Sequence, residues 1–302
     1  MSGVEHVLEI KNVIGEGPVW NHAEGALYWV DFIENQQILR YYPDSGKQEQ
    51  FDTKDPVTAV GLRSGGGLIV STTRGLAFWN SESKELEYIS RPLNNRPHIR
   101  FNDAAVDRRG RFWVGTVNTE DGTKPDGELY RFDPDGSIRS MADGFTVSNG
   151  IGWSPDGLKL YFADTFNYCV HVFDFDPESG AISNRRTFTD FTDSKLLPDG
   201  LTIDQAGGVW VAFWGGWKVV RFDPVGRIDE EIRMPVANPT SCAFGGADLD
   251  ELYITTARLG LSNNERLQQP LAGDLFRVRP GVKGIEEPAF GVQPSGWHSK
   301  TS

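Results

Sequence analysis

A repeated segment of about 40 to 50 residues constrains the fold of this chain more than any other feature. Each copy begins with a polar residue and continues through a short strand, a turn rich in Gly, Pro and Asp, and further short strands. The six copies open at Glu16, Thr58, Asn102, Asn149, Asp199 and Thr240, with spacings of 42, 44, 47, 50 and 41 residues. About four strands in such a period are typical of one β-propeller blade. The sequence therefore predicts an all-β, six-bladed β-propeller with four-stranded blades.

The six copies leave no block of sequence for another domain, so we expect residues 1–302 to form a single propeller. The alternating segment 5–10 precedes the first copy and could add the outer strand to the last blade. That pairing would close the ring and remove an open sheet edge. The alternative, two unrelated β-sandwiches of about 150 residues each, does not predict six aligned units.

The amino-acid composition excludes several classes of structure and of binding partner. The 34 Gly and 17 Pro leave little room for long helices, and the net charge of −12 argues against nucleic acid or an anionic membrane surface. No apolar run approaches the length of a membrane span, and the first residues do not resemble a secretory signal. Two cysteines, Cys169 and Cys242, are too few for a disulfide framework. We expect a soluble, cytoplasmic protein that binds neither nucleic acid nor membrane; its oligomeric state stays open.

The polar residue that opens each copy is the candidate functional position. The opening strand of a blade is innermost in a propeller, so its first residue stands at one mouth of the central channel. The resulting ring contains two carboxylates and two amides, which suit a hard divalent cation with oxygen ligands. Asn149-Gly150 and Asp199-Gly200 are also typical of hairpin turns, but the other openings carry no common turn chemistry. A polar channel lining without chemistry is the alternative interpretation.

Other site chemistries find little support. The chain contains no H-E-x-x-H, G-x-S-x-G, G-x-x-x-x-G-K-[ST] or G-x-G-x-x-G motif. Its five histidines fall at no common metal spacing, and only His98 lies near the proposed mouth. Zinc-protease, serine-hydrolase and nucleotide-binding sites are therefore not indicated.

Several motifs together resemble the family of senescence marker protein-30 (regucalcin), gluconolactonase and bacterial sugar-acid lactonases. They are Arg100-Phe101-Asn102-Asp103, Gly115-Thr116, Ser148-Asn149-Gly150, Pro198-Asp199-Gly200 and Trp214-Gly215-Gly216. The resemblance covers almost the whole chain and implies a six-bladed fold. It also implies one divalent cation in the channel mouth (Ca²⁺, Zn²⁺, Mn²⁺, Mg²⁺ or Fe²⁺). The implied substrate is a small sugar lactone, such as glucono-, xylono- or arabinonolactone.

The resemblance also implies roles for individual residues. The cation ligands would be Glu16, Asn149 and Asp199, with Asn102 nearby as a ligand through water or a substrate contact. Substrate contacts would come from Arg100, Asn102 and Glu120.

The chain departs from the family pattern just before Asn102. Family members often read Asn-Asn-Arg directly before x-Asn-Asp, whereas here Asn94-Asn95-Arg96 is followed by Pro97-His98-Ile99 and a second arginine, Arg100. Two arginines therefore compete for the substrate role. The R-x-N-D spacing favours Arg100, and Arg96 is the reserve.

The expected reaction is cation-assisted hydrolysis of a cyclic ester, with Asp199 accepting the proton of the attacking water. The competing assignment is water activated by the cation without a separate base. Two other classes of protein stay open: a calcium-binding regulatory propeller without lactonase activity, and a propeller that serves as a platform for protein interactions. A related esterase or phosphotriesterase on the same scaffold is a third alternative.

Overall fold

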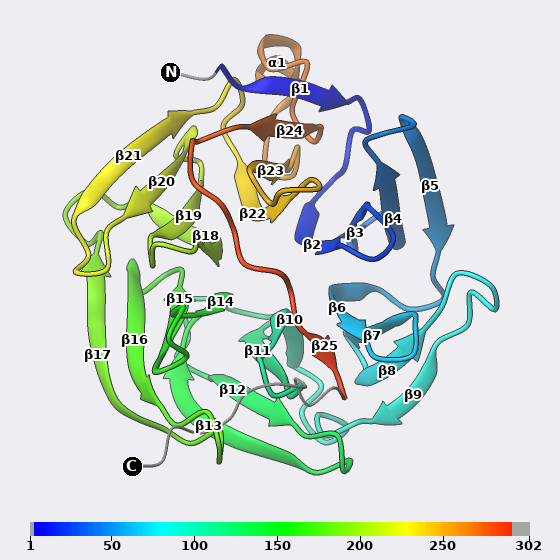
Figure 1. The fold of residues 1–302 in the computed structure, drawn as a ribbon, viewed down its shortest axis with the longest axis vertical. Coiled ribbons are helices and arrows are strands. Elements are labelled where there is room, and N and C mark those ends of the chain that lie inside the picture. Colours follow the sequence, from blue (N-terminus) through cyan, green and yellow to red (C-terminus); the bar gives the residue numbers. More distant parts are fainter. Residues whose placement is uncertain (1–2, 292–302) are drawn as a thin grey trace.

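The computed structural model describes residues 3–291, which form six small antiparallel sheets around a central channel (Figure 1). Blade 1 contains β2 (Gly15–Asn21), β3 (Ala26–Asp31), β4 (Gln37–Tyr42) and β5 (Lys47–Asp52). Blade 2 contains β6 (Val57–Arg63), β7 (Leu68–Thr72), β8 (Leu76–Trp79) and β9 (Glu87–Ser90). Blade 3 contains β10 (Ile99–Val106), β11 (Phe112–Asn118), β12 (Gly127–Phe132) and β13 (Ile138–Phe145).

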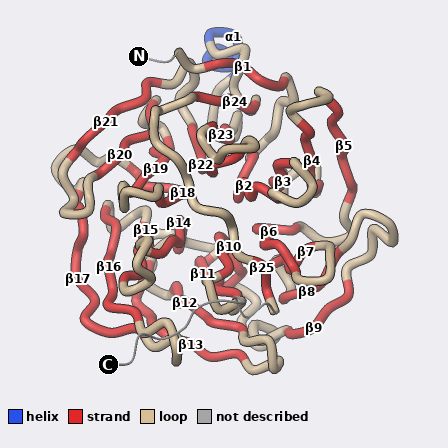
Figure 2. The backbone as a smooth tube through the Cα atoms, in the orientation of Figure 1, coloured by secondary structure: helices blue, strands red, loops and turns tan. Residues whose placement is uncertain are grey.

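The other three blades repeat this order from the channel outwards. Blade 4 contains β14 (Ser148–Trp153), β15 (Lys159–Asp164), β16 (Cys169–Phe175) and β17 (Ile182–Asp190). Blade 5 contains β18 (Leu197–Ile203), β19 (Val209–Trp214), β20 (Lys218–Phe222) and β21 (Ile228–Arg233). Blade 6 contains β22 (Pro239–Gly245), β23 (Glu251–Thr256), β24 (Leu275–Val278) and β1 (Glu5–Leu8), with the short helix α1 (Asn263–Gln268) between β23 and β24. The six-bladed, four-stranded prediction is confirmed (Figure 2).

The N-terminal strand closes the ring, as the sequence predicts. β1 pairs antiparallel with β24, and Glu5 lies opposite Arg277. The Arg277 guanidinium donates hydrogen bonds to the carboxylates of Glu5 and Glu251, so an ion-pair network spans three neighbouring strands of the closing blade. The strand nearest the N-terminus thus shares one sheet with β22, β23 and β24. The expectation of a single domain over residues 1–302 includes residues 1–2 and 292–302, which lie outside the described residues.

The core is divided among the interfaces between blades. Six clusters of buried apolar side chains each join the facing sheets of two neighbouring blades. The cluster at the point of closure packs Trp20, Trp29 and Tyr41 of blade 1 against Tyr253 and Leu275 of blade 6. Because the second strand of each blade is buried on both faces, apolar residues occupy β3, β11, β15 and β19 almost without alternation, whereas the outer strands β5, β17 and β21 are mostly exposed.

A β-bulge interrupts the inner strand of every blade near its start. The register with the second strand shifts after Glu16, Val57, Phe101, Asn149, Pro198 and Pro239. A bulge adds a residue to one strand and turns its side chain out of the regular pleat. The six bulges therefore stand at one level of the channel, at or beside the ring residues that the repeat singles out.

A C-terminal strap, residues 279–288, crosses the end of the channel that lies opposite the ring residues (Figure 1). It leads from β24 to β25 (Ala289–Phe290), which pairs in parallel with β6. On its way Gly284 forms a bridge with Asp204, the residue that follows the inner strand of blade 5. The strap therefore covers the mouth at which the inner strands end.

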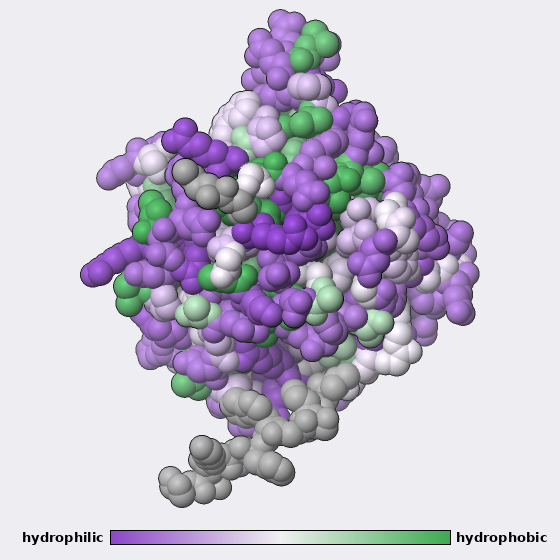
Figure 3. Space-filling model, turned by 45° about the horizontal axis from the view of Figure 1, so that its top comes forward, coloured by the Kyte–Doolittle hydropathy of each residue, from purple (hydrophilic) through white to green (hydrophobic). Residues whose placement is uncertain are grey.

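Hydrophilic residues dominate the surface in the view of Figure 3, where hydrophobic residues form small separate groups. Among residues 3–291, the structure has no helix with the length and apolar character needed to cross a bilayer.

Candidate active site

Four of the six ring residues offer polar groups at the channel mouth, and two are occupied in packing. The hydroxyl of Thr58 shares a hydrogen bond with Ser71 Oγ at 2.8 Å. The hydroxyl of Thr240 donates to the Gly15 carbonyl and contacts Thr255. Both threonines join blades or strands. The acids and amides of the ring, Glu16, Asn102, Asn149 and Asp199, are thus the groups left for chemistry.

A chain of hydrogen bonds orients the two amides. Arg100 Nη1 donates to Asn102 Oδ1 at 2.7 Å, and Asn102 Nδ2 donates to Asn149 Oδ1 at 2.7 Å. Asn149 Nδ2 donates to Thr165 Oγ1 at 2.9 Å, and that hydroxyl donates to the Pro198 carbonyl at 2.8 Å. The Asn149 amide donates through its nitrogen to Thr165 and accepts through its oxygen from Asn102. These two contacts fix the orientation of the amide, with its oxygen towards Asn102. The chain ends at the residue just before Asp199 and so joins blades 3, 4 and 5.

Two buried carboxylates, Glu16 and Asp199, lie beside this chain. Both side chains are more than nine-tenths buried. Burial raises the pKa of Glu16 well above its usual value, and the negative charges of Asp199 and Asp103 raise it further. Burial likewise raises the pKa of Asp199, with Asp103 adding to the effect. The two carboxyl groups are close enough to share a hydrogen bond when one of them is protonated.

Asp103 is the third acid of the site. It follows Asn102 inside the bulge of β10, and its Oδ1 accepts a hydrogen bond from the backbone N–H of Ala104 at 2.8 Å. Burial raises its pKa to about 6. Asp103 stands in the Arg100–Asp103 motif, but the repeat register assigns it no role, because a register does not show which residues a bulge turns towards the channel.

Arg100 belongs to the site, whereas Arg96 does not contact it. The Arg100 guanidinium lies over the ring of Phe32, with 5.1 Å between the guanidinium carbon and the ring centroid. Burial lowers its pKa to about 10, and the negative charge of Glu16 opposes that shift. Arg96 instead forms an ion pair with Glu128 and donates to the Tyr130 hydroxyl at 3.2 Å.

Glu120 lies at the same end of the channel as Arg100. It is exposed on the loop that follows β11, and its backbone N–H donates to Asn118 Oδ1 at 2.9 Å. The preceding residue, Thr119, donates its backbone N–H to the His98 carbonyl at 2.8 Å, one residue before β10 begins. Among residues 3–291 no hydrogen bond or ion pair joins the Glu120 side chain to the ring residues, so its role as a substrate contact stays a prediction.

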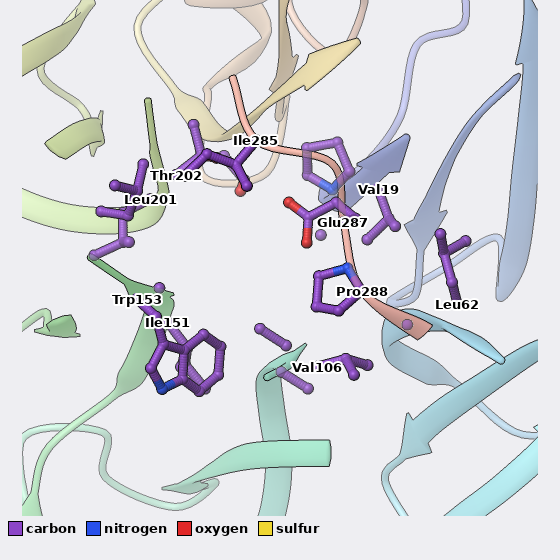
Figure 4. A pocket seen from close by; sticks show the side chains of 18 of the residues that line it. Val19, Leu62, Val106, Ile151, Trp153, Leu201, Thr202, Ile285, Glu287 and Pro288 are labelled. Atoms are coloured by element: carbon purple, nitrogen blue, oxygen red, sulfur yellow. The ribbon is translucent and has the colours of Figure 1, made fainter. Parts of the chain in front are cut away.

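The channel continues below the ring as a cavity of about 90 Å³. Asp103 and Gly17 line it on the side of the ring, and Glu287 of the strap lines its far side. Figure 4 shows the Glu287 carboxylate directed into the space between Leu201, Trp153 and Val19. Burial raises the pKa of Glu287 to about 7, against the effect of Arg108. The strap thus forms the end of the channel that lies opposite the candidate site.

The donor set fits a hard divalent cation. Glu16 and Asp199 supply carboxylate oxygens whose raised pKa values reflect buried negative charge, and Asn149 supplies an amide oxygen of fixed orientation. Oxygen ligands of this kind suit Ca²⁺, Mg²⁺ or Mn²⁺. Within residues 3–291 no group of three or more His, Cys, Asp or Glu side chains is placed to hold a metal ion.

The fold and the mouth define a class of protein: a six-bladed propeller with acids and amides gathered at one end of its channel. Comparison with known proteins makes the assignment specific. Residues 14–258 match the SMP-30/gluconolactonase/LRE-like region, and the chain belongs to this family. The recognition made from the sequence motifs is thereby confirmed.

Relatives resemble the chain over nearly its whole length. Regucalcin of Xenopus laevis is 35% identical over 295 residues, which cover 95% of this chain and 98% of the relative. YvrE of Bacillus subtilis, named provisionally as a sugar lactone lactonase, is 37% identical over 283 residues. The aligned residues cover 93% of this chain and 96% of YvrE. A crystal structure of a calcium-binding protein, regucalcin, from Agrobacterium tumefaciens matches with a TM-score of 0.91 at 25% identity, over 96% of this chain and 98% of its own.

Thr165 is a second residue that sequence analysis missed. It follows β15 and carries no motif, and its importance comes only from its two hydrogen bonds to Asn149 and to the Pro198 carbonyl. A search for hydroxyl residues directly after the second strand of a blade would have found it. The sequence alone gives no reason to make that search.

Proposed function

We propose that this protein is a lactonase that hydrolyses a sugar lactone at the channel mouth, with one divalent cation held by Glu16, Asn149 and Asp199. The observation that carries the proposal is the pair of buried, mutually repelling carboxylates beside the oriented amide of Asn149. Buried like charges destabilise a fold unless they are protonated or a cation compensates them. Membership of a family with lactonase-named relatives supplies the reaction class.

The residues of the channel mouth have separate roles in the proposed ester hydrolysis. When bound, a divalent cation supplies Lewis-acid polarisation of an ester carbonyl. Asp199 accepts the proton of the attacking water, a role that suits a carboxylate whose pKa lies above its ordinary value. Arg100 and Asn102 hold substrate hydroxyls, since the guanidinium has donors left beyond its bond to Asn102. Glu120 is proposed as a further contact at the rim.

A regulatory calcium-binding propeller is the second candidate. It is favoured by the likeness to the Agrobacterium protein, which is described as calcium-binding. In that case the same three ligands hold the cation, but the protein opens no lactone. Measured turnover therefore separates the two candidates.

The test is hydrolysis of a lactone in a weakly buffered assay, in which the acid that the reaction releases is measured. Protein stripped of metal should be inactive against glucono-, xylono- and arabinonolactones, and one or more added divalent cations should restore turnover. Asp199→Ala should abolish activity and leave the fold intact, whereas Asp193→Ala, which changes an exposed loop acid, should leave the activity unchanged. Full turnover by Asp199→Ala would overturn the proposal.

Asp199→Asn separates the two routes for activating water. This variant keeps a side-chain oxygen as a ligand and loses the base. It should bind the cation yet lose most turnover if Asp199 takes the proton. The preferred lactone, the physiological cation and the cytoplasmic location stay predictions.

A further inference from the structure

The turn between β10 and β11 carries three arginines, Arg108, Arg109 and Arg111. In this turn Asp107 accepts backbone hydrogen bonds from Arg109 and Arg111 and one from the Trp113 indole. The matching turn of blade 5 has the same construction: Asp204 accepts from the N–H groups of Ala206 and Gly208 and from the Trp210 indole. Blade 5 has Gln205, Ala206 and Gly208 in place of the three arginines, and there Arg221 supplies the guanidinium that pairs with Asp204, as Arg111 does with Asp107. Arg108 and Arg109 have no such counterpart in blade 5.

These arginines line a second cavity, of about 940 Å³, at the strap end of the channel. Arg63, Arg108, Arg109 and Arg111 line it together with Trp153, Phe175, Pro177 and Pro288. Small-molecule sites commonly enclose about 300–1,000 Å³ and combine apolar walls with a few polar groups. The strap separates this cavity from the carboxylates of the channel mouth, so the two sites face opposite ends of the propeller.

The four arginines differ in whether a carboxylate of the protein already forms an ion pair with them. Arg111 pairs with Asp107 at 2.6 Å and donates to the Pro177 carbonyl, and Arg109 pairs with Glu178. Arg63 lies over the Phe78 ring at 3.8 Å, and Arg108 donates to the Pro155 carbonyl. Within residues 3–291 no carboxylate lies within ion-pair distance of Arg63 or Arg108. These two are the cations available to a ligand.

The acids around the cavity limit the charge of that ligand. Glu24 is engaged with the Tyr28 hydroxyl and with Arg40. Glu286 and Glu287 stand on the strap, and burial keeps the pKa of Glu287 near neutrality, at about 7. Asp156 and Glu287 both act on the charge of Arg108, so the positive charge left unmatched is small and favours a single negative charge on the ligand over a polyanion.

The apolar walls define the body of the ligand. The Trp153 and Phe175 rings meet edge to face at 6.0 Å, and Pro177 and Pro288 add further apolar surface. We propose that this cavity binds a small planar organic monocarboxylate, whose carboxylate pairs with Arg108 and Arg63 and whose ring packs against Trp153 and Phe175. An Arg fork pairs with a carboxylate through parallel hydrogen bonds, and aromatic surface favours a flat apolar body.

The experiment uses 2-naphthoate as probe and isothermal titration calorimetry of the full chain as readout. Two matched probes share the ring system: neutral 2-naphthylmethanol and cationic 2-naphthylmethylamine. We expect one naphthoate per chain and weaker binding of both analogues. Arg108→Gln and Arg63→Gln should each weaken naphthoate binding by about tenfold, because each removes a charge-assisted hydrogen bond. Arg233→Gln, which changes a side chain that is 90% exposed on blade 5, should have no effect.

Further variants locate the probe on the protein. Phe175→Leu should weaken binding, whereas Asp199→Ala should leave it unchanged, because Asp199 lies at the other mouth. Three results would each overturn the proposal: no binding of naphthoate, tighter binding of the cationic analogue, or an equal loss of binding in Arg233→Gln. Loss of naphthoate binding in Asp199→Ala would place the probe at the catalytic mouth and would also overturn it.

Discussion

Asn149 Nδ2 donates a hydrogen bond to Thr165 Oγ1 at 2.9 Å, and this contact decides which atom of the amide faces the channel mouth. Thr165 uses its own proton on the Pro198 carbonyl, so its oxygen is left as an acceptor. Asn149 must therefore turn its nitrogen towards Thr165 and its oxygen towards Asn102, whose amide donates to one lone pair of that oxygen and leaves the other for a cation. Thr165 is a positioning residue, since it acts on the site through Asn149.

Thr165→Val should weaken cation binding while the propeller stays folded. The valine keeps the shape of the side chain but cannot accept the hydrogen bond, so the amide loses its fixed orientation. A lost hydrogen bond contributes about 1 kcal/mol, which corresponds to about fivefold in affinity. Titration with Mn²⁺ measures the effect, and Thr187→Val, on an exposed position of β17, is the matched control. Equal affinities in both variants would remove the positioning role.

Arg100→Ala should raise the KM for the lactone, and Arg96→Ala should leave it almost unchanged. Arg100 is buried beside Glu16 and Asn102, whereas the Arg96 guanidinium is taken up by Glu128. Hydrogen bonds to charged groups contribute about 1.5–3 kcal/mol, so the increase in KM should be about tenfold or more. Steady-state kinetics on both variants decide the matter, and the reverse order would reassign the substrate arginine.

Cation-free protein should become less stable as the pH rises from about 5 to 8. Burial raises the pKa of Glu16, Asp199 and Asp103 above their ordinary values, so the folded state binds more protons than the unfolded chain. Stability present at low pH is then lost as the pH rises towards the folded pKa values. One pKa unit corresponds to about 1.4 kcal/mol, so the loss should be on the order of 1–3 kcal/mol.

Urea unfolding at the two pH values, with a chelator or with a saturating cation, measures this effect. Glu16→Gln should reduce the pH dependence, because it removes one of the interacting acids. A slope that is identical with chelator and with cation would contradict the assignment of the carboxylates to a cation site.

Phe290→Ala should destabilise the fold, because Phe290 lies in β25 and anchors the end of the strap on the propeller. Phe290 is 5% exposed and stacks on Phe132 of blade 3 at 5.6 Å, with Phe78 of blade 2 at 6.0 Å. Truncation of a buried phenylalanine costs about 3–5 kcal/mol. Thermal unfolding checks the prediction against Val225→Ala, a change at a side chain that is 70% exposed. A loss below about 1 kcal/mol would show that the strap rests on the propeller without stabilising it.

The fold could be predicted from the sequence because the pattern that defines a blade repeats along the chain. Six openings at similar spacing, each followed by a turn, are sufficient for six blades, and the N-terminal segment needs only one free edge to pair with. The strap could not be predicted in this way. Residues 279–290 have no counterpart in the repeat, and their place depends on contacts with blades that lie far away in sequence.

The site was predictable only as far as the repeat register reaches. Glu16, Asn149 and Asp199 share one position of the repeat, so circular arrangement brings them to one mouth. Asp103 and Thr165 have no such position: a bulge turns the first towards the channel, and hydrogen bonds across blades give the second its role. The R-x-N-D spacing favoured Arg100 and kept Arg96 as the reserve, and the side-chain contacts place Arg100 beside Asn102 and Arg96 beside Glu128.

The central claim is that three residues distant in sequence hold one ion. Anomalous diffraction from crystals of the protein soaked in Mn²⁺ tests it most directly. The account predicts a single strong anomalous peak in contact with the side-chain oxygens of Glu16, Asn149 and Asp199, absent in Asp199→Ala. A peak elsewhere, or none at the channel mouth at a concentration that supports turnover, would contradict it.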